Sequence, residues 1–146
     1  ERSALLKFYE NFGYWVNLMT DLTLSGKHPN DTDNLNQHQA KINDAYCQLL
    51  LSEARMTFFL EDNELLGLKN KMKMEVMTRF QQPLGVCMLS MMKNNVTINS
   101  ANPDLSVKNL ECIAKYSKVV LEGYAVLNPI LHEFQTKARK HLYKSS

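Results

Sequence analysis

The chain has 146 residues, of which 45% are apolar and 22% are charged, and its formal net charge is +2. This size and composition predict a single soluble domain, 1–146, with a hydrophobic core. The 5 Gly and 4 Pro argue against a collagen-like repeat, a low-complexity linker or a turn-rich all-β barrel, and no apolar run reaches the roughly 18 residues that a transmembrane helix needs.

A first helix is predicted over 3–25, because apolar residues recur there at alternating spacings of three and four and so share one face. Its predicted core residues are Leu5, Phe8, Phe12, Trp15, Met19 and Leu22. Gly26 is expected to end this helix. The polar stretch 27–34 that follows is predicted to be a loop whose last residues cap the next helix.

A second helix is predicted over 33–61, where the same spacing continues. Its predicted core residues are Leu35, His38, Ile42, Ala45, Leu49, Ser52, Met56 and Phe59. Further apolar residues in this helix fall well outside the core face, namely Cys47, Leu50, Leu51, Ala54 and Phe58. A helix whose apolar side chains cover more than half of its circumference is either central in its domain or buried by a partner.

A third helix is predicted over 63–93, with Asp62 or Asn63 as its cap. Its predicted core residues are Leu65, Leu68, Met72, Val76, Phe80, Leu84, Cys87 and Met91. Pro83 lies inside this helix. Because proline lacks a backbone N–H and its ring clashes with the preceding turn, we expect a kink or a break near Gln82.

A fourth helix is predicted over 103–143, after a loop at 94–102, and Pro129 is expected to bend it. Its predicted core residues are Leu110, Ile113, Ser117, Val120, Tyr124, Leu127, Leu131, Phe134 and Ala138. No segment alternates with a period of two, so no strand is predicted. The fold class is therefore all-α, and the short connections predict an antiparallel up-down four-helix bundle with long, Pro-kinked third and fourth helices.

In this arrangement the start of the first helix and the end of the fourth lie at the same end of the bundle, where the longer fourth helix would overhang the first. The chain begins at Glu1 without a Met, so we hypothesise that a segment preceding Glu1 was removed and that it tethers the native protein to a membrane. A basic cluster, Lys137, Arg139, Lys140 and Lys144, would then face anionic lipids. The alternative is that these cations only stabilise the C-terminal end of a helix.

The cysteines and the charge distribution suggest a compartment and a class of partner. Cys47, Cys87 and Cys112 are odd in number and widely spaced, which predicts reduced thiols and a cytoplasmic location. Residues 1–68 carry 5 basic and 10 acidic groups, and residues 69–146 carry 12 and 5, so the two halves are predicted to attract each other within the bundle. Without a recognition motif or a basic run interleaved with aromatic residues, no nucleic-acid binding is expected.

No residue pattern typical of catalysis or metal binding is found. His38, His132 and His141 have no Asp or Glu three or four residues away, and His28 has only Asp31, in a loop with a proline. The Gly-rich motifs that bind phosphates and dinucleotides are absent from the sequence. We therefore predict no catalytic residue, cofactor or metal, and a non-enzymatic protein.

Seven of the 8 methionines lie between residues 56 and 92. Those predicted to fill the core are Met72, Met88 and Met91. Met74, Met77 and Met92 cannot all face inward with them, so part of this set is available to a partner. The leading hypothesis is a protein-contact module that forms a homo-oligomer through the second helix and the Met-bearing face of the third. The candidate contact residues are Cys47, Leu51, Ala54, Phe58, Met74 and Met77.

The alternative hypothesis is a ligand-sensing bundle flanked by membrane helices. Five phenylalanines are predicted to gather at the end of the bundle where the tether would be: Phe8, Phe12, Phe58, Phe59 and Phe134. Core packing is the simplest explanation of such a cluster. A small apolar ligand site at that end is the functional alternative.

Overall fold

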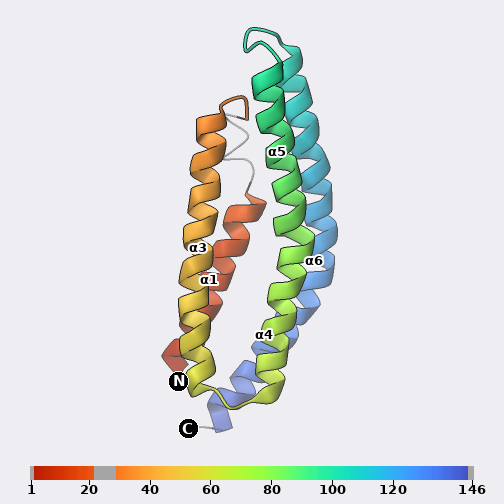
Figure 1. Ribbon diagram of the computed structural model, residues 1–146. Helices are drawn as coiled ribbons and strands as arrows, with labels where there is room; N and C mark the ends of the chain where they lie inside the picture. Colours follow the sequence, from red (N-terminus) through yellow and green to blue (C-terminus); the bar gives the residue numbers. More distant parts are fainter. Residues whose placement is uncertain (1, 22–28, 145–146) are drawn as a thin grey trace.

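The computed structural model describes residues 2–21 and 29–144, and within these ranges it is all helical, without a strand (Figure 1). The elements are α1 (Arg2–Thr20), α3 (Thr32–Phe59), α4 (Asn63–Val76), the π-helix η1 (Met77–Gln81), α5 (Gln82–Thr97) and α6 (Asp104–Lys144). Because α4, η1 and α5 follow one another without a gap, the described residues form four helical rods. The predicted all-α class is thereby confirmed.

The helix boundaries fall close to the predicted ones, except at the ends of α1 and α5. That helix ends at Thr20, whereas the prediction carried it to residue 25. The rest of the predicted span, 22–25, and the stop at Gly26 lie outside the described residues. In contrast, α5 continues four residues beyond the predicted end of the third helix, to Thr97.

Two aspartates cap helices as the sequence predicts. The Asp31 carboxylate accepts a hydrogen bond from the Asp33 N–H at 2.9 Å and begins α3. The Asp62 carboxylate accepts from the N–H groups of Glu64 and Leu65, at 3.0 and 3.2 Å, and begins α4. These caps satisfy amide groups that have no partner within a helix, so they fix where the chain leaves each connection.

The four rods pack as two helical hairpins (Figure 1). In the first hairpin, Asn11 of α1 bonds to Gln48 of α3, and the Leu18 carbonyl bonds to His38, so residue numbers rise along one helix as they fall along the other. In the second hairpin, Lys137 near the end of α6 pairs with Glu64 at the start of α4. Most of the extra length of α6 lies at its first turns, beside α5, and not at the end predicted to overhang α1 (Figure 1).

The core runs between the hairpins, and aromatic rings are its largest side chains. Its largest fully buried side chains include Trp15, Phe8, Phe12, Phe80 and Phe134. Phe8 of α1 packs edge-on against Phe134 of α6, with ring centroids 6.2 Å apart. Met72, Met88 and Met91 are also buried, which confirms their predicted role as core residues.

The first half of α6 presents a different face to the core than predicted. Leu110 and Ser117 are exposed, whereas Asn109, Tyr116 and Gly123 are buried. The prediction failed because it assigned the core by apolarity, and two of these three side chains are polar groups that find partners inside. The Tyr116 hydroxyl donates to the carbonyl oxygens of Met19 and Phe80, at 2.9 and 3.3 Å.

Asn109 ties the α1–α3 connection to the second hairpin. Its amide nitrogen donates to the Pro29 carbonyl and to the side-chain oxygens of Asn30 and Asn95, all within 3.0 Å. Its own oxygen accepts from the Asn94 amide at 3.1 Å. A fully buried amide is tolerated because both of its ends are hydrogen-bonded.

Pro83 follows a π-helical turn and does not break its helix. Proline in an α-helix clashes with the carbonyl four residues earlier, here that of Arg79. In η1 the backbone bonds span five residues, as in the bond from the Gln82 N–H to the Met77 carbonyl, so the turn before the proline is wider. The helix therefore continues from Asn63 to Thr97. The kinks predicted at Pro83 and Pro129 remain predictions.

Position 123 of α6 needs a glycine, because the Phe80 ring packs directly against its backbone. A methyl group at this position would overlap the buried Phe80 ring. We expect Gly123→Ala to destabilise the fold by up to about 2 kcal/mol, because an overpacking cost of about 1–3 kcal/mol is offset only in part by the roughly 1 kcal/mol that alanine gains in a helix.

Urea unfolding followed by circular dichroism measures this cost, and Gly67→Ala is the matched control. Gly67 lies in α4 with open space around its missing Cβ, so its replacement should stabilise the protein by about 1 kcal/mol. Equal gains from both substitutions would contradict the proposed overlap.

Candidate functional site

Four of the candidate contact residues form one exposed row on α3, which we call the α3 outer stripe: Cys47, Leu51, Ala54 and Phe58. Their spacing of four, three and four places them on one side of the helix. The buried residues Ala45, Leu49, Ser52 and Met56 lie on the opposite side. Leu51 is 67% exposed and Phe58 is 82% exposed, so this stripe is apolar surface turned away from the bundle.

The two candidate methionines on the third rod lie in different surroundings. Met74 is 62% exposed on α4. Met77, the first residue of η1, is half-buried and packs against the core. Only Met74 therefore adds a freely accessible side chain to the candidate contact surface.

The five phenylalanines predicted to cluster at one end divide into two groups. Phe8, Phe12 and Phe134 are buried in the core. Phe58 and Phe59 are exposed at the end of α3, where their rings contact each other edge to face with centroids 5.1 Å apart. The second pair extends the apolar surface of α3 instead of lining an internal ligand site.

A buried ion cluster joins α3 to α4 behind this surface. Glu53 of α3 contacts the ammonium groups of Lys73 and Lys69, at 2.7 and 3.3 Å. Lys73 also lies over the ring of Tyr46, 5.9 Å from its centroid. Since acidic and basic partners come from the acidic and basic halves of the chain, these pairs agree with the predicted attraction between the two halves.

The basic cluster at the end of α6 is partly engaged within the domain. Lys137 donates to Glu64 at 2.8 Å, and this hydrogen bond raises the pKa of Lys137. Arg139 lines a shallow apolar groove with Leu5 and Leu6 of α1, while Lys140 and Lys144 are exposed. The start of α1 and the end of α6 lie at the same end of the molecule (Figure 1). Contact of this end with a membrane stays a prediction.

Among the cysteines and histidines in the described ranges, His141 lies beside a carboxylate, with its Nδ1 atom 3.5 Å from Asp62 Oδ2. All three cysteines are free thiols. Burial raises the pKa of Cys87 to about 11, which keeps this thiol neutral at physiological pH. His38 is half-buried beside the Leu18 carbonyl, and burial lowers its pKa. Within 2–21 and 29–144, no three His, Cys, Asp or Glu side chains come close enough together to hold a metal ion.

Sequence analysis missed a second apolar region, on α5 and α6. Val86, Leu89 and Val96 of α5 are strongly exposed, and a cavity of about 260 Å³ opens between the two helices. The available signal was that Val86 and Leu89 fall outside the core positions of their helix. Which residues of α6 lie opposite them depends on the pairing of the two helices, and that pairing cannot be read from helical periodicity alone.

No known protein family matches the chain, and neither a curated protein nor a solved structure is significantly similar to it. None of the described helices has the length and apolar character needed to span a membrane. The function is therefore inferred from the residues of this chain and their geometry.

Proposed function

We propose that this chain is a non-enzymatic protein-contact module, an antiparallel up-down bundle that forms a homo-oligomer through the α3 outer stripe and Met74, with Met77 at the inner edge of the contact. The observation that carries the proposal is the exposure of Leu51 and Phe58 on a helix whose opposite side already fills the core. Large apolar side chains gathered on one surface are typical of interaction sites.

The apolar gain from covering this surface is substantial. Removing an exposed Leu or Phe side chain fully from water contributes about 1.5–3 kcal/mol. Phe58 and Leu51 are two turns apart on the stripe, so one partner helix can contact both. A second copy of the chain offers the same row, and two identical rows can pair around a twofold axis.

Replacing both Leu51 and Phe58 with Lys is expected to dissociate the oligomer into monomers. Each lysine would place a charge in the apolar contact, where it is desolvated without a partner. Sedimentation velocity over a concentration series measures the mass, and circular dichroism checks that helicity is unchanged. Both side chains are exposed in the single chain, so the fold should survive the substitutions.

The matched control is the double variant Val96→Lys and Leu121→Lys, which changes two equally exposed apolar residues on α5 and α6. This variant should keep the mass of the unaltered protein. The proposal fails if the unaltered chain is monomeric at high micromolar concentration, or if the α3 variant keeps the oligomer.

A further inference from the structure

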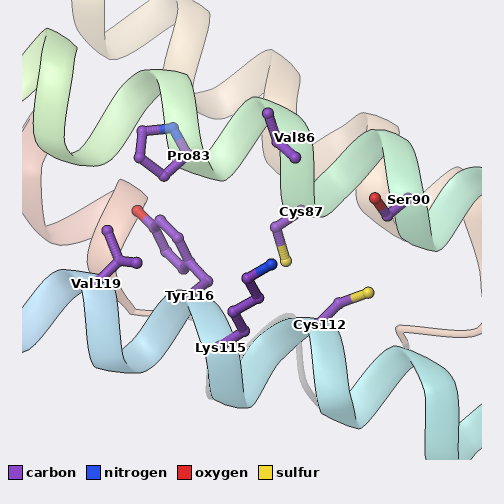
Figure 2. Close-up of a pocket in the computed structure, with 8 residues that line it drawn as sticks. All are labelled: Pro83, Val86, Cys87, Ser90, Cys112, Lys115, Tyr116 and Val119. Carbon is purple, nitrogen blue, oxygen red and sulfur yellow. The ribbon is translucent and has the colours of Figure 1, made fainter.

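A cavity of about 260 Å³ lies between α5 and α6, the neighbouring helices of the second hairpin (Figure 2). We call it the α5–α6 pocket. Its wall on α5 consists of Pro83, Val86, Cys87 and Ser90, and its wall on α6 consists of Cys112, Lys115, Tyr116 and Val119. The pocket shares no residue with the α3 outer stripe, so it is a separate site.

Apart from Lys115, the residues that line this pocket are uncharged side chains. The Tyr116 hydroxyl is occupied by the carbonyl oxygens of Met19 and Phe80 in the core, so the pocket meets the ring of this residue (Figure 2). Cys87 is a buried, neutral thiol. With Pro83, Val86 and Val119 also on the walls, the apolar part of an occupant would contact mainly carbon and sulfur.

Lys115 is the cationic residue among those that line this pocket. Lys115 of α6 is exposed, and its side chain reaches toward Cys87 across the seam (Figure 2). Among the described residues, Lys115 has no carboxylate within ion-pair distance, unlike Lys69, Lys73 and Lys137. Its ammonium group is therefore available to a negatively charged ligand group, and Ser90 adds a hydroxyl on the opposite wall.

The pocket also lies at an irregularity of the fold. Pro83, which lines it, comes two residues after the π-helical turn η1. Short π-helical turns within α-helices occur frequently at functional sites. Here the turn and the proline together set the course of the α5 backbone along the pocket.

We propose that the α5–α6 pocket binds a small amphiphilic monocarboxylate, with its carboxylate on Lys115 and its apolar body between Val86, Val119 and the Tyr116 ring. Its volume limits the size of that body. A cavity of about 150 Å³ holds benzene, so about 260 Å³ accommodates one ring with a short chain, or an aliphatic chain of about eight carbons.

Three ligands with one eight-carbon body test this site: octanoate, 1-octanol and octylammonium. Calorimetric titration of the full chain gives the affinities, and the methyl NMR signals of Val86 and Val119 locate the binding. We expect the order octanoate, then octanol, then octylammonium. Lys115→Gln should weaken octanoate about fivefold and leave octanol unchanged, so that the two bind alike.

Two further variants keep the outcome interpretable. Lys118→Gln removes an exposed lysine one turn away that does not line the pocket, and it should leave octanoate affinity unchanged. Val86→Trp places a large side chain over the pocket from a position that is already 68% exposed, so it should fold and abolish binding of all three ligands.

The proposal is overturned by any of three results. These are no saturable binding of octanoate, equal affinity for octanoate and octanol in the unaltered chain, or equal losses in the Lys115 and Lys118 variants. Retained oligomer mass in the Val86→Trp variant would show that the pocket acts independently of the α3 outer stripe, so failure of one proposal does not decide the other.

Discussion

Replacing Glu53 with Gln should reduce the free energy of unfolding by about 3–5 kcal/mol, the usual cost of removing one partner from a buried ion cluster. The Glu53 side chain is only 13% exposed, and those of Lys69 and Lys73 are 9% and 15% exposed. Glutamine keeps the shape of the side chain but leaves two largely buried ammonium groups without a counter-charge. The loss is therefore electrostatic and not a loss of packing.

Urea unfolding of Glu53→Gln tests this expectation against two other variants. Glu75→Gln removes the partner of Arg79 in a pair within one helix that is more exposed than the Glu53 cluster, and it should cost no more than about 0.5 kcal/mol. Adding Lys69→Met to Glu53→Gln should restore part of the stability, because one uncompensated charge is then gone. If Glu53→Gln costs no more than Glu75→Gln, the cluster does not hold α3 to α4.

Most of the helical architecture could be predicted from apolar spacing, because one buried face per helix is enough to define its period. The errors arose where polar groups enter the core. Asn109 and Tyr116 look like surface residues in the sequence, yet they are buried because partners from α1, α5 and the α1–α3 connection satisfy them. The π-helical turn was missed because its backbone pattern leaves no periodicity signal, and only Pro83 marked the place.

Part of the candidate contact surface could be predicted from the sequence. Cys47, Leu51, Ala54 and Phe58 could be separated from the core because both sets recur at helical spacing on opposite sides of one helix. The α5–α6 pocket could not be predicted from the sequence, because its walls come from two helices whose relative rotation depends on Asn109 and Tyr116. An apolar pattern can place a residue on a face, but it cannot tell which residue of another helix lies opposite.

Substitutions at Trp15 are also expected to change the free energy of unfolding strongly. The packing of its ring stabilises the fold, whereas its buried N–H group without a partner destabilises it. The side chain is fully buried, packed against Phe12 and Tyr46 with ring centroids 6.1 and 5.2 Å away. Among the described residues, its Nε1–H has no hydrogen-bond partner. Trp15→Ala should cost about 3–5 kcal/mol, the usual loss for a large aromatic residue in a core.

Trp15→Phe is expected to cost about 1 kcal/mol or less. Phenylalanine keeps most of the aromatic packing and removes a buried donor whose missing hydrogen bond costs about 1–3 kcal/mol, which offsets the small cavity left by the narrower ring. Trp15 is the only tryptophan, so unfolding of both variants is followed by circular dichroism and not by fluorescence. If Trp15→Phe is nearly as destabilising as Trp15→Ala, the indole N–H is satisfied in solution, and the stabilising contribution of Trp15 includes a hydrogen bond as well as its ring.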